Sequence, residues 1–180
     1  MLAALGILNW LFASVELPFV SDAGDSYRAA VVYLTIPLGA SLTALSMLPS
    51  RLSWWERASI RRLFLQRALA YWTVTAFAVS CALSGAERTV LPHPVVLGLQ
   101  GVLAGVGLGG IILQIASFEM CVTILLVYGL AGILVPPTAD AVRLALLYGG
   151  SASSARLSAA LAVWLVGALV FSLFPGHRGT

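Results

Sequence analysis

The stretch 98-GLQGVLAGVGLGG-110 decides the fold of this chain. It places Gly101, Gly105 and Gly109 at four-residue intervals, which brings small residues onto one face of a helix. Because lipid supplies no hydrophobic drive between helices, such a face is typical of close helix packing in membranes. The stretch lies inside an apolar run from Pro94 to Val135. We predict helix packing for the three glycines, with a role in substrate contact or flexing as the alternative.

The composition extends this interpretation to the whole chain. Of its 180 residues 60% are hydrophobic and 9% are charged, and the mean hydropathy is +0.98, whereas a soluble domain is about 25% charged. One crossing takes roughly 20 apolar residues. The fold class is therefore predicted to be all-α, a polytopic membrane helical bundle in a single domain, 1–180. The expected spans are 2–20, 29–48, 68–84, 94–113, 119–135 and 153–174.

Two connecting segments carry structure of their own. The turn between the fourth and fifth spans is placed at 114–119, with Glu119 at the membrane surface. In 136-PPTADAVRLALLYGG-150 two prolines precede Thr138, a suitable N-cap, and two glycines end the helix. About eleven helical residues span roughly 16 Å, half of the hydrocarbon core. This segment is expected to be a short re-entrant outer helix before the sixth span.

The stretch 52-LSWWERASIRRLFLQR-67 gathers charge in an otherwise apolar chain. Its arginines and tryptophans predict a cytoplasmic interfacial helix between the second and third spans. Six spans then leave both termini cytoplasmic, in a multi-pass protein of the plasma membrane. The simpler alternative is that these arginines only set topology and touch anionic lipid. The cytoplasmic side receives Arg51, Arg57, Arg61, Arg62, Arg67 and Arg178, and the outer side receives Arg28, Arg88, Arg143 and Arg156.

Several kinds of chemistry are excluded. All ten basic residues are arginine, and without lysine there is neither a P-loop nor a Schiff base. Cys81 and Cys121 form no CxxC pair and are interpreted as small buried hydrophobic residues. Gly39 to Leu42 contain the Gly-x-Ser spacing of intramembrane serine proteases, but no histidine lies in a later span to activate Ser41. We expect no enzyme, no catalytic residue, no metal site and no cofactor.

Polar residues within or beside the spans are functional candidates by default. The acidic ones fall near predicted span ends, which favours ordinary interfacial placement. The set consists of Asn9, Glu16, Gln100, Gln114 and Glu119.

Two stretches, 49-PSRLSWWERASIRRLFLQR-67 and 135-VPPTADAVRLALLYGG-150, carry a resemblance to a known family. With six spans around them, the chain resembles the permease subunits of ABC-2 type exporters in their short actinobacterial form. The resemblance implies a separate ABC ATPase subunit that pushes the basic helix, and a second permease as homodimer or heterodimer. Membrane lipids are the other partners, and no nucleic acid is expected. The implied ATPase contact consists of Trp54, Trp55, Glu56, Arg57, Arg61 and Arg62.

The predicted function is the transmembrane subunit of an ABC exporter for a peptide, antibiotic or amphiphile. The family usually has a cytoplasmic amphipathic helix before the first span, and here that span begins at residue 2. Two alternatives remain open. One is a non-transporting membrane protein of self-resistance or assembly, and the other is the six-span substrate-binding subunit of a vitamin importer.

Overall fold

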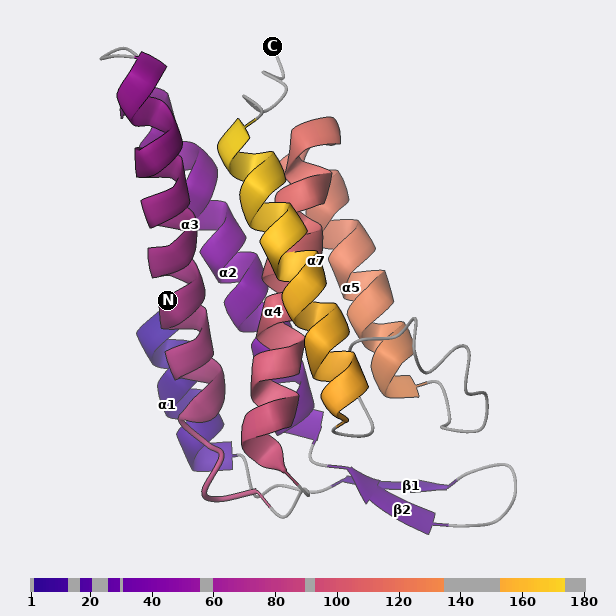
Figure 1. The fold of residues 1–180 in the computed structure, drawn as a ribbon. Helices are drawn as coiled ribbons and strands as arrows, with labels where there is room; N and C mark the ends of the chain where they lie inside the picture. The colour runs from indigo at the N-terminus through magenta and orange to yellow at the C-terminus, as the bar shows by residue number, and fades with distance from the viewer. Residues whose placement is uncertain are drawn as a thin grey trace.

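The computed structural model describes residues 2–12, 17–20, 26–29, 31–55, 60–89, 93–134 and 153–173, and side chains within 3–12, 35–48, 64–89, 93–131 and 153–173. The described residues form an α-helical bundle, as predicted, with one short antiparallel hairpin (Figure 1). The elements are α1 (Leu2–Phe12), β1 (Leu17–Val20), β2 (Ser26–Ala29), α2 (Val31–Trp55), α3 (Ile60–Leu83), α4 (Pro94–Ile115), α5 (Phe118–Leu134) and α7 (Ser154–Leu173).

Helix α4 lies at the centre of the bundle. It packs most extensively against α7, and further against α2, α3 and α5. Its residues between Leu97 and Gly110 are buried on almost every side. Helix α1 is short and covers part of α2 and α3 (Figure 1). The helix with the predicted glycine face is therefore the one around which the others assemble.

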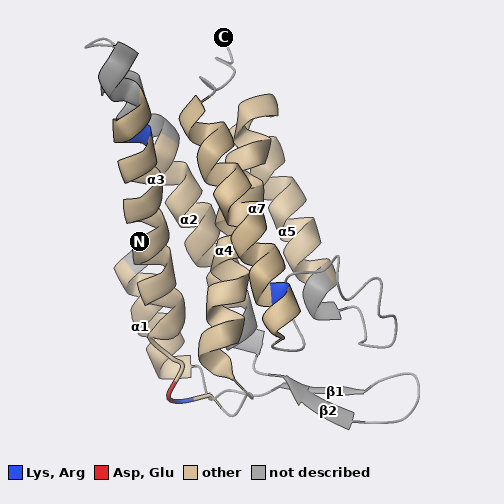
Figure 2. Ribbon diagram, viewed as in Figure 1, with Lys and Arg blue, Asp and Glu red and all other residues tan. Residues whose placement is uncertain are grey.

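The bundle has two distinct ends. At the hairpin end, β1 and β2 lie near the start of α4 and the start of α7 (Figure 1). At the opposite end, here called the basic end, α2 finishes at Trp55 and α3 begins at Ile60. Within the part of the chain whose side chains are described, the charged residues lie within about two turns of a helix end. Figure 2 shows the middle of the bundle without charge.

Local chemistry explains several helix starts. His93 adopts a left-handed conformation (φ 53°, ψ 53°) and is followed by Pro94 in the first turn of α4, a position where the missing N–H of proline costs no hydrogen bond. Ser117 caps α5, because its hydroxyl accepts a hydrogen bond from the Met120 N–H at 3.4 Å. Ser153 caps α7 in the same way through the Arg156 N–H at 3.2 Å.

The expected first span, 2–20, is wrong in its second half. Helix α1 ends at Phe12, and Leu17–Val20 is a strand whose register pairs Leu17 with Ala29 and Val20 with Ser26. Pro18 would cost a helix continuing from α1 one hydrogen bond and a clash with the preceding turn, although α2 accepts this cost at Pro37. The Asp-Ala-Gly-Asp sequence between the strands supplies typical turn residues.

The basic stretch also differs from the expectation of a separate interfacial helix. Helix α2 continues to Trp55 and α3 already begins at Ile60, so the described parts of 52–67 belong to the ends of two long helices. Arginine is a good helix former, and the stretch contains no glycine. The predicted re-entrant helix at 136–150 lies outside the described residues.

The other boundaries agree closely with the expected ranges. Helix α4 ends at Ile115 and α5 begins at Phe118, so their connection falls within 114–119. Among the described residues, α4 and α7 are long and apolar enough to cross a membrane. Their 22 and 20 residues correspond to about 33 and 30 Å. By themselves they are a weak indication of membrane association, because a core helix of a soluble protein has the same length and composition.

Candidate functional site

Helices α4 and α7 approach each other backbone to backbone at two glycines. A Cβ atom built on Gly107 would lie 2.7 Å from the Cα and backbone N of Trp164. A Cβ on Gly167 would meet the carbonyl oxygen of Gly107 and lie 2.9 Å from its Cα. Real Cβ atoms do not approach backbone atoms this closely. The two backbones can therefore lie against each other only because both residues are glycine.

The predicted glycine face is only partly the packing face. Gly101, Gly105 and Gly109 are all buried. A Cβ on Gly109 would meet the side chain of Leu45 from α2, with Cδ2 at 3.1 Å, rather than a backbone. The four-residue spacing thus identifies the correct helix, but it misses Gly107 and Gly167. Gly107 lies inside the glycine-rich run 98–110 and Gly167 stands beside Ala168, so no spacing in the sequence singles out either of them.

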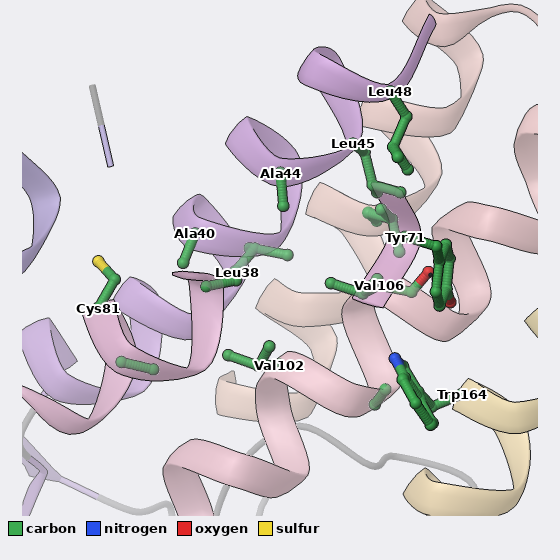
Figure 3. Packing of buried hydrophobic residues seen from close by; sticks show 14 of the residues in the cluster. Leu38, Ala40, Ala44, Leu45, Leu48, Tyr71, Cys81, Val102, Val106 and Trp164 are labelled. Carbon is green, nitrogen blue, oxygen red and sulfur yellow. Dashed lines mark hydrogen bonds between the residues drawn. The ribbon is translucent and has the colours of Figure 1, made fainter. Parts of the chain in front are cut away.

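Polar side chains tie α3 to this contact. The Tyr71 hydroxyl donates a hydrogen bond to the carbonyl oxygen of Val106 on α4, at 3.1 Å. The Trp164 indole N–H of α7 donates to Thr75 Oγ1 at 3.2 Å, and that hydroxyl donates to the Tyr71 carbonyl oxygen at 2.7 Å. Figure 3 shows Tyr71 and Trp164 side by side next to Val106, and their ring centroids are 6.0 Å apart. Helices α3, α4 and α7, here called the α3–α4–α7 unit, are joined by these contacts.

Replacing Tyr71 with phenylalanine is expected to reduce the free energy of unfolding by about 1 kcal/mol, since hydrogen bonds between membrane helices average ~0.6 and reach ~1.7 kcal/mol. Thr73→Val is the matched control. It also removes a hydroxyl from α3, but that hydroxyl donates to Leu69 of its own helix at 2.7 Å on an exposed face. Unfolding by SDS in mixed micelles measures both variants. Equal losses would contradict a role for the Tyr71 hydroxyl in joining the helices.

A second polar contact holds α1 against the end of α3. Asn9 is 0% exposed, and its Nδ2 donates to the carbonyl oxygens of Cys81 at 3.2 Å and Ala82 at 2.9 Å. The Ser84 hydroxyl donates to the Gly6 carbonyl oxygen at 2.9 Å. The last carbonyls of a helix have no partner within it. Asn9, a candidate from the sequence, therefore acts here as a cap supplied by another helix.

The remaining described polar candidates lie on α2, α4 and α5. Ser41 is buried, and its hydroxyl donates to the Pro37 carbonyl oxygen of its own helix at 2.7 Å. Gln100 is buried in α4, and Gln114 is half-buried near its end. Glu119 is exposed in the first turn of α5, where the helix dipole favours a carboxylate. Glu16 lies outside the described residues.

Neither cysteine forms a disulfide, and both are buried in the hydrophobic core. The Cys121 thiol donates to the Gly109 carbonyl oxygen at 3.7 Å, a weak contact. Cys81 lies beneath α1, where a Cβ on Gly6 would be 3.8 Å from its sulfur. These positions agree with the interpretation of both residues as small buried hydrophobic side chains.

Four of the residues predicted to contact an ATPase belong to described helices, and all four lie at the basic end. Trp54 and Trp55 are the last two residues of α2, and Arg61 and Arg62 directly follow the first residue of α3. Glu56 and Arg57 lie outside the described residues. The structure thus distributes this group over two adjacent helix ends.

Two arginines that the sequence places at the membrane surface are buried. Arg67, about two turns into α3, is 5% exposed, and Arg156, in the first turn of α7, is 6% exposed. They lie near opposite ends of the bundle, because α3 begins at the basic end and α7 begins at the hairpin end (Figure 1). Burying a cation is costly unless it is paired, so both arginines are functional candidates. The signal in the sequence is that apolar helix follows each of them directly, so each lies within a packed helix and not in a loop.

At the hairpin end the Arg88 guanidinium lies over the Trp10 ring, 3.6 Å from its centroid. This cation–π pair joins the segment after α3 to the end of α1. Within the described ranges, no group of three or more His, Cys, Asp or Glu residues could hold a metal ion. The described arrangement offers helix packing, polar links between helices and charge at the two ends. No protein-family model, curated protein or solved structure matches this chain.

Proposed function

We propose that this chain is a multi-pass protein of the plasma membrane and the permease subunit of an ABC exporter, driven by a separate ATPase subunit. The cargo class is a peptide, an antibiotic or an amphiphile. The observation that carries the proposal is a bundle with an apolar outer surface and a concentration of arginine at one end.

The outer surface supports the membrane part of the proposal. Large apolar side chains are exposed on every described helix except α2, whose described side chains face mainly inward. Monomeric soluble proteins rarely expose contiguous apolar patches above a few hundred Å², whereas lipid covers such a surface at no cost. On α3, α5 and α7 the exposed apolar side chains include Leu65, Leu69, Trp72 and Phe77 of α3, Ile124, Val127 and Leu130 of α5, and Leu161, Leu165 and Leu169 of α7.

The basic end supports the orientation and the partner. Arginines close to a membrane favour the cytoplasmic side, which directs the ends of α2 and α3 toward the cytoplasm. A chain without lysine has no P-loop of its own, so a separate subunit must bind and hydrolyse ATP. The ends of α2 and α3 would receive that subunit, with Trp54 and Trp55 as packed anchors and the arginines as the salt-sensitive part of the contact.

In this proposal the residues of the chain do mechanical work and no chemistry. Force applied at the basic end enters α2 and α3 together, because the contact is shared by both helix ends. Through Tyr71 and the glycine contact, α3 would carry α4 and α7 with it as one rigid body.

Mild detergent extraction of the tagged protein, followed by mass spectrometry, tests the proposed function. We expect a nucleotide-binding ABC subunit to copurify in a defined ratio and to be lost at high salt. Recovery of the intact bundle with no such subunit at low salt would contradict the exporter function and favour a non-transporting membrane protein.

A further inference from the structure

Helix α5 contacts the rest of the bundle along a narrow stripe. Its fully buried residues are Cys121, Leu125 and Gly129, which recur every fourth residue. Tyr128 is half-buried beside them and packs against the core. Most of the other described side chains of α5 are apolar and exposed, among them Met120 and Val127. A helix held along one stripe has less buried surface to lose on moving than a central helix.

The contacts described along this stripe, here called the seam, each join a side-chain end to the backbone of a glycine. A Cβ on Gly129 would lie 2.7 Å from Cδ2 and 3.1 Å from Cδ1 of Leu38 on α2. The contact with α4 includes the weak hydrogen bond from the Cys121 thiol to the Gly109 carbonyl oxygen, at 3.7 Å. The ends of leucine side chains change rotamer at little cost, so this seam can open and close again.

The contacts inside the α3–α4–α7 unit are of another kind. Gly107 and Gly167 bring backbone against backbone, and the hydrogen bonds of Tyr71 and Trp164 cross between helices. Packed interfaces of this kind move as rigid bodies. Helix α1 is likewise fastened to α3 by the carbonyl contacts of Asn9.

Helix α5 is joined to α4 by a short connection. Only Ala116 and Ser117 separate it from α4, and Ala116 is extended, with φ −134° and ψ 161°. Rotation about the backbone dihedrals of two non-helical residues reorients the following helix without breaking a hydrogen bond inside it.

We propose that α5 is the moving helix of this bundle. It swings about Ala116 and Ser117, separates Gly129 from Leu38, and leaves the α3–α4–α7 unit unchanged. The connection of this motion to ATP-driven export rests on the proposed function, whereas the motion itself does not.

Distance measurements between spin labels in lipid nanodiscs test the motion without any ATPase. In a Cys81→Ala, Cys121→Ala background, Phe77→Cys on α3 is paired with Val127→Cys on α5 or, as the matched control, with Leu161→Cys on α7. All three positions are exposed. We expect one narrow distance for the control pair and a second, longer distance for the pair that includes α5. Equally narrow distributions for both pairs would overturn the proposal.

A disulfide across the seam provides the second arm. In a protein that also carries Leu38→Cys and Gly129→Cys, oxidation of these two thiols to a disulfide should remove the longer distance between positions 77 and 127. Reduction of the disulfide should restore it. If the longer distance persists in the oxidised protein, the seam is not where α5 moves and the proposal fails. With a copurified ATPase present, the oxidised protein should keep the subunit but lose ATP-driven export. If no ATPase copurifies, the proposed function fails, while the distances in lipid still decide whether α5 moves.

Discussion

Gly107→Ala should destabilise the bundle more than an alanine at those glycines of α4 that face side chains, because Gly107 faces a backbone. The added methyl would lie 2.7 Å from the backbone of Trp164, and a backbone cannot step aside as a side chain can. Overpacking of a tight core typically costs about 1–3 kcal/mol and occasionally more. We expect a loss at the upper end of this range, because α4 and α7 must separate along their whole contact.

Two matched substitutions calibrate this result. Gly109→Ala, two residues further along α4, meets the flexible end of Leu45 and should cost less. Gly39→Ala in α2 would place its Cβ 3.8 Å from the Leu5 methyl groups, an ordinary contact. It should be neutral or stabilise by up to about 1 kcal/mol, the helix-propensity advantage of alanine over glycine. The loss of unfolding free energy, measured in mixed micelles, should be largest for Gly107→Ala, smaller for Gly109→Ala and absent for Gly39→Ala. A loss at Gly109 as large as at Gly107 would contradict the packing described.

Gly167→Ala extends the test to the partner helix. Because Gly107 and Gly167 share one contact, separating the helices for either methyl makes room for the other. The double variant should therefore lose less than the sum of the two single losses. Strict additivity would mean that the glycines act independently.

Reversing two charges at the basic end should have the largest effect on the proposed function. Arg61→Glu with Arg62→Glu turns attraction for an acidic partner surface into repulsion, and like charges placed against each other cost several kcal/mol. The amount of copurified ATPase should fall on the order of 100-fold, since about 2.8 kcal/mol corresponds to that factor. Any ATP-driven export should disappear with it.

Arg88→Glu is the control for this reversal. Arg88 is an exposed arginine at the hairpin end, remote from the proposed contact. It should leave the recovery of ATPase unchanged, although it removes the cation–π pair with Trp10. If the double variant recovers as much ATPase as the unchanged protein, or if Arg88→Glu loses as much as the double variant, the basic end is not the ATPase contact.

The parts of the fold that the sequence predicts are those decided by local pattern. The long apolar run, interrupted near Ser117, is enough to place α4, α5 and their turn. The first span is wrong because a count of apolar residues does not register Pro18. The basic stretch looks amphipathic by itself, but the helices on either side extend into it, and only the assembled bundle shows where they end.

The details of the candidate site depend on contacts between helices. A four-residue spacing shows that Gly101, Gly105 and Gly109 share a face, but Trp164 and Tyr71 determine which face of α4 meets α7. Asn9 looks like an isolated polar residue in the sequence. Its role becomes clear only when the carbonyl oxygens at the end of α3 lie beside it. Such pairings are formed by residues far apart in the chain, which periodicity does not connect.

Labelling of single cysteines from the two sides of the membrane tests the central claim most directly. In intact cells of a variant without native cysteines, Ser59→Cys, directly before α3 in the sequence, and His93→Cys at the hairpin end are treated with a membrane-impermeant maleimide. A bundle that crosses the membrane with its basic end in the cytoplasm predicts labelling of position 93 in intact cells and of position 59 only after the cells are opened. Labelling of position 59 from outside, or identical accessibility of both positions, would contradict it.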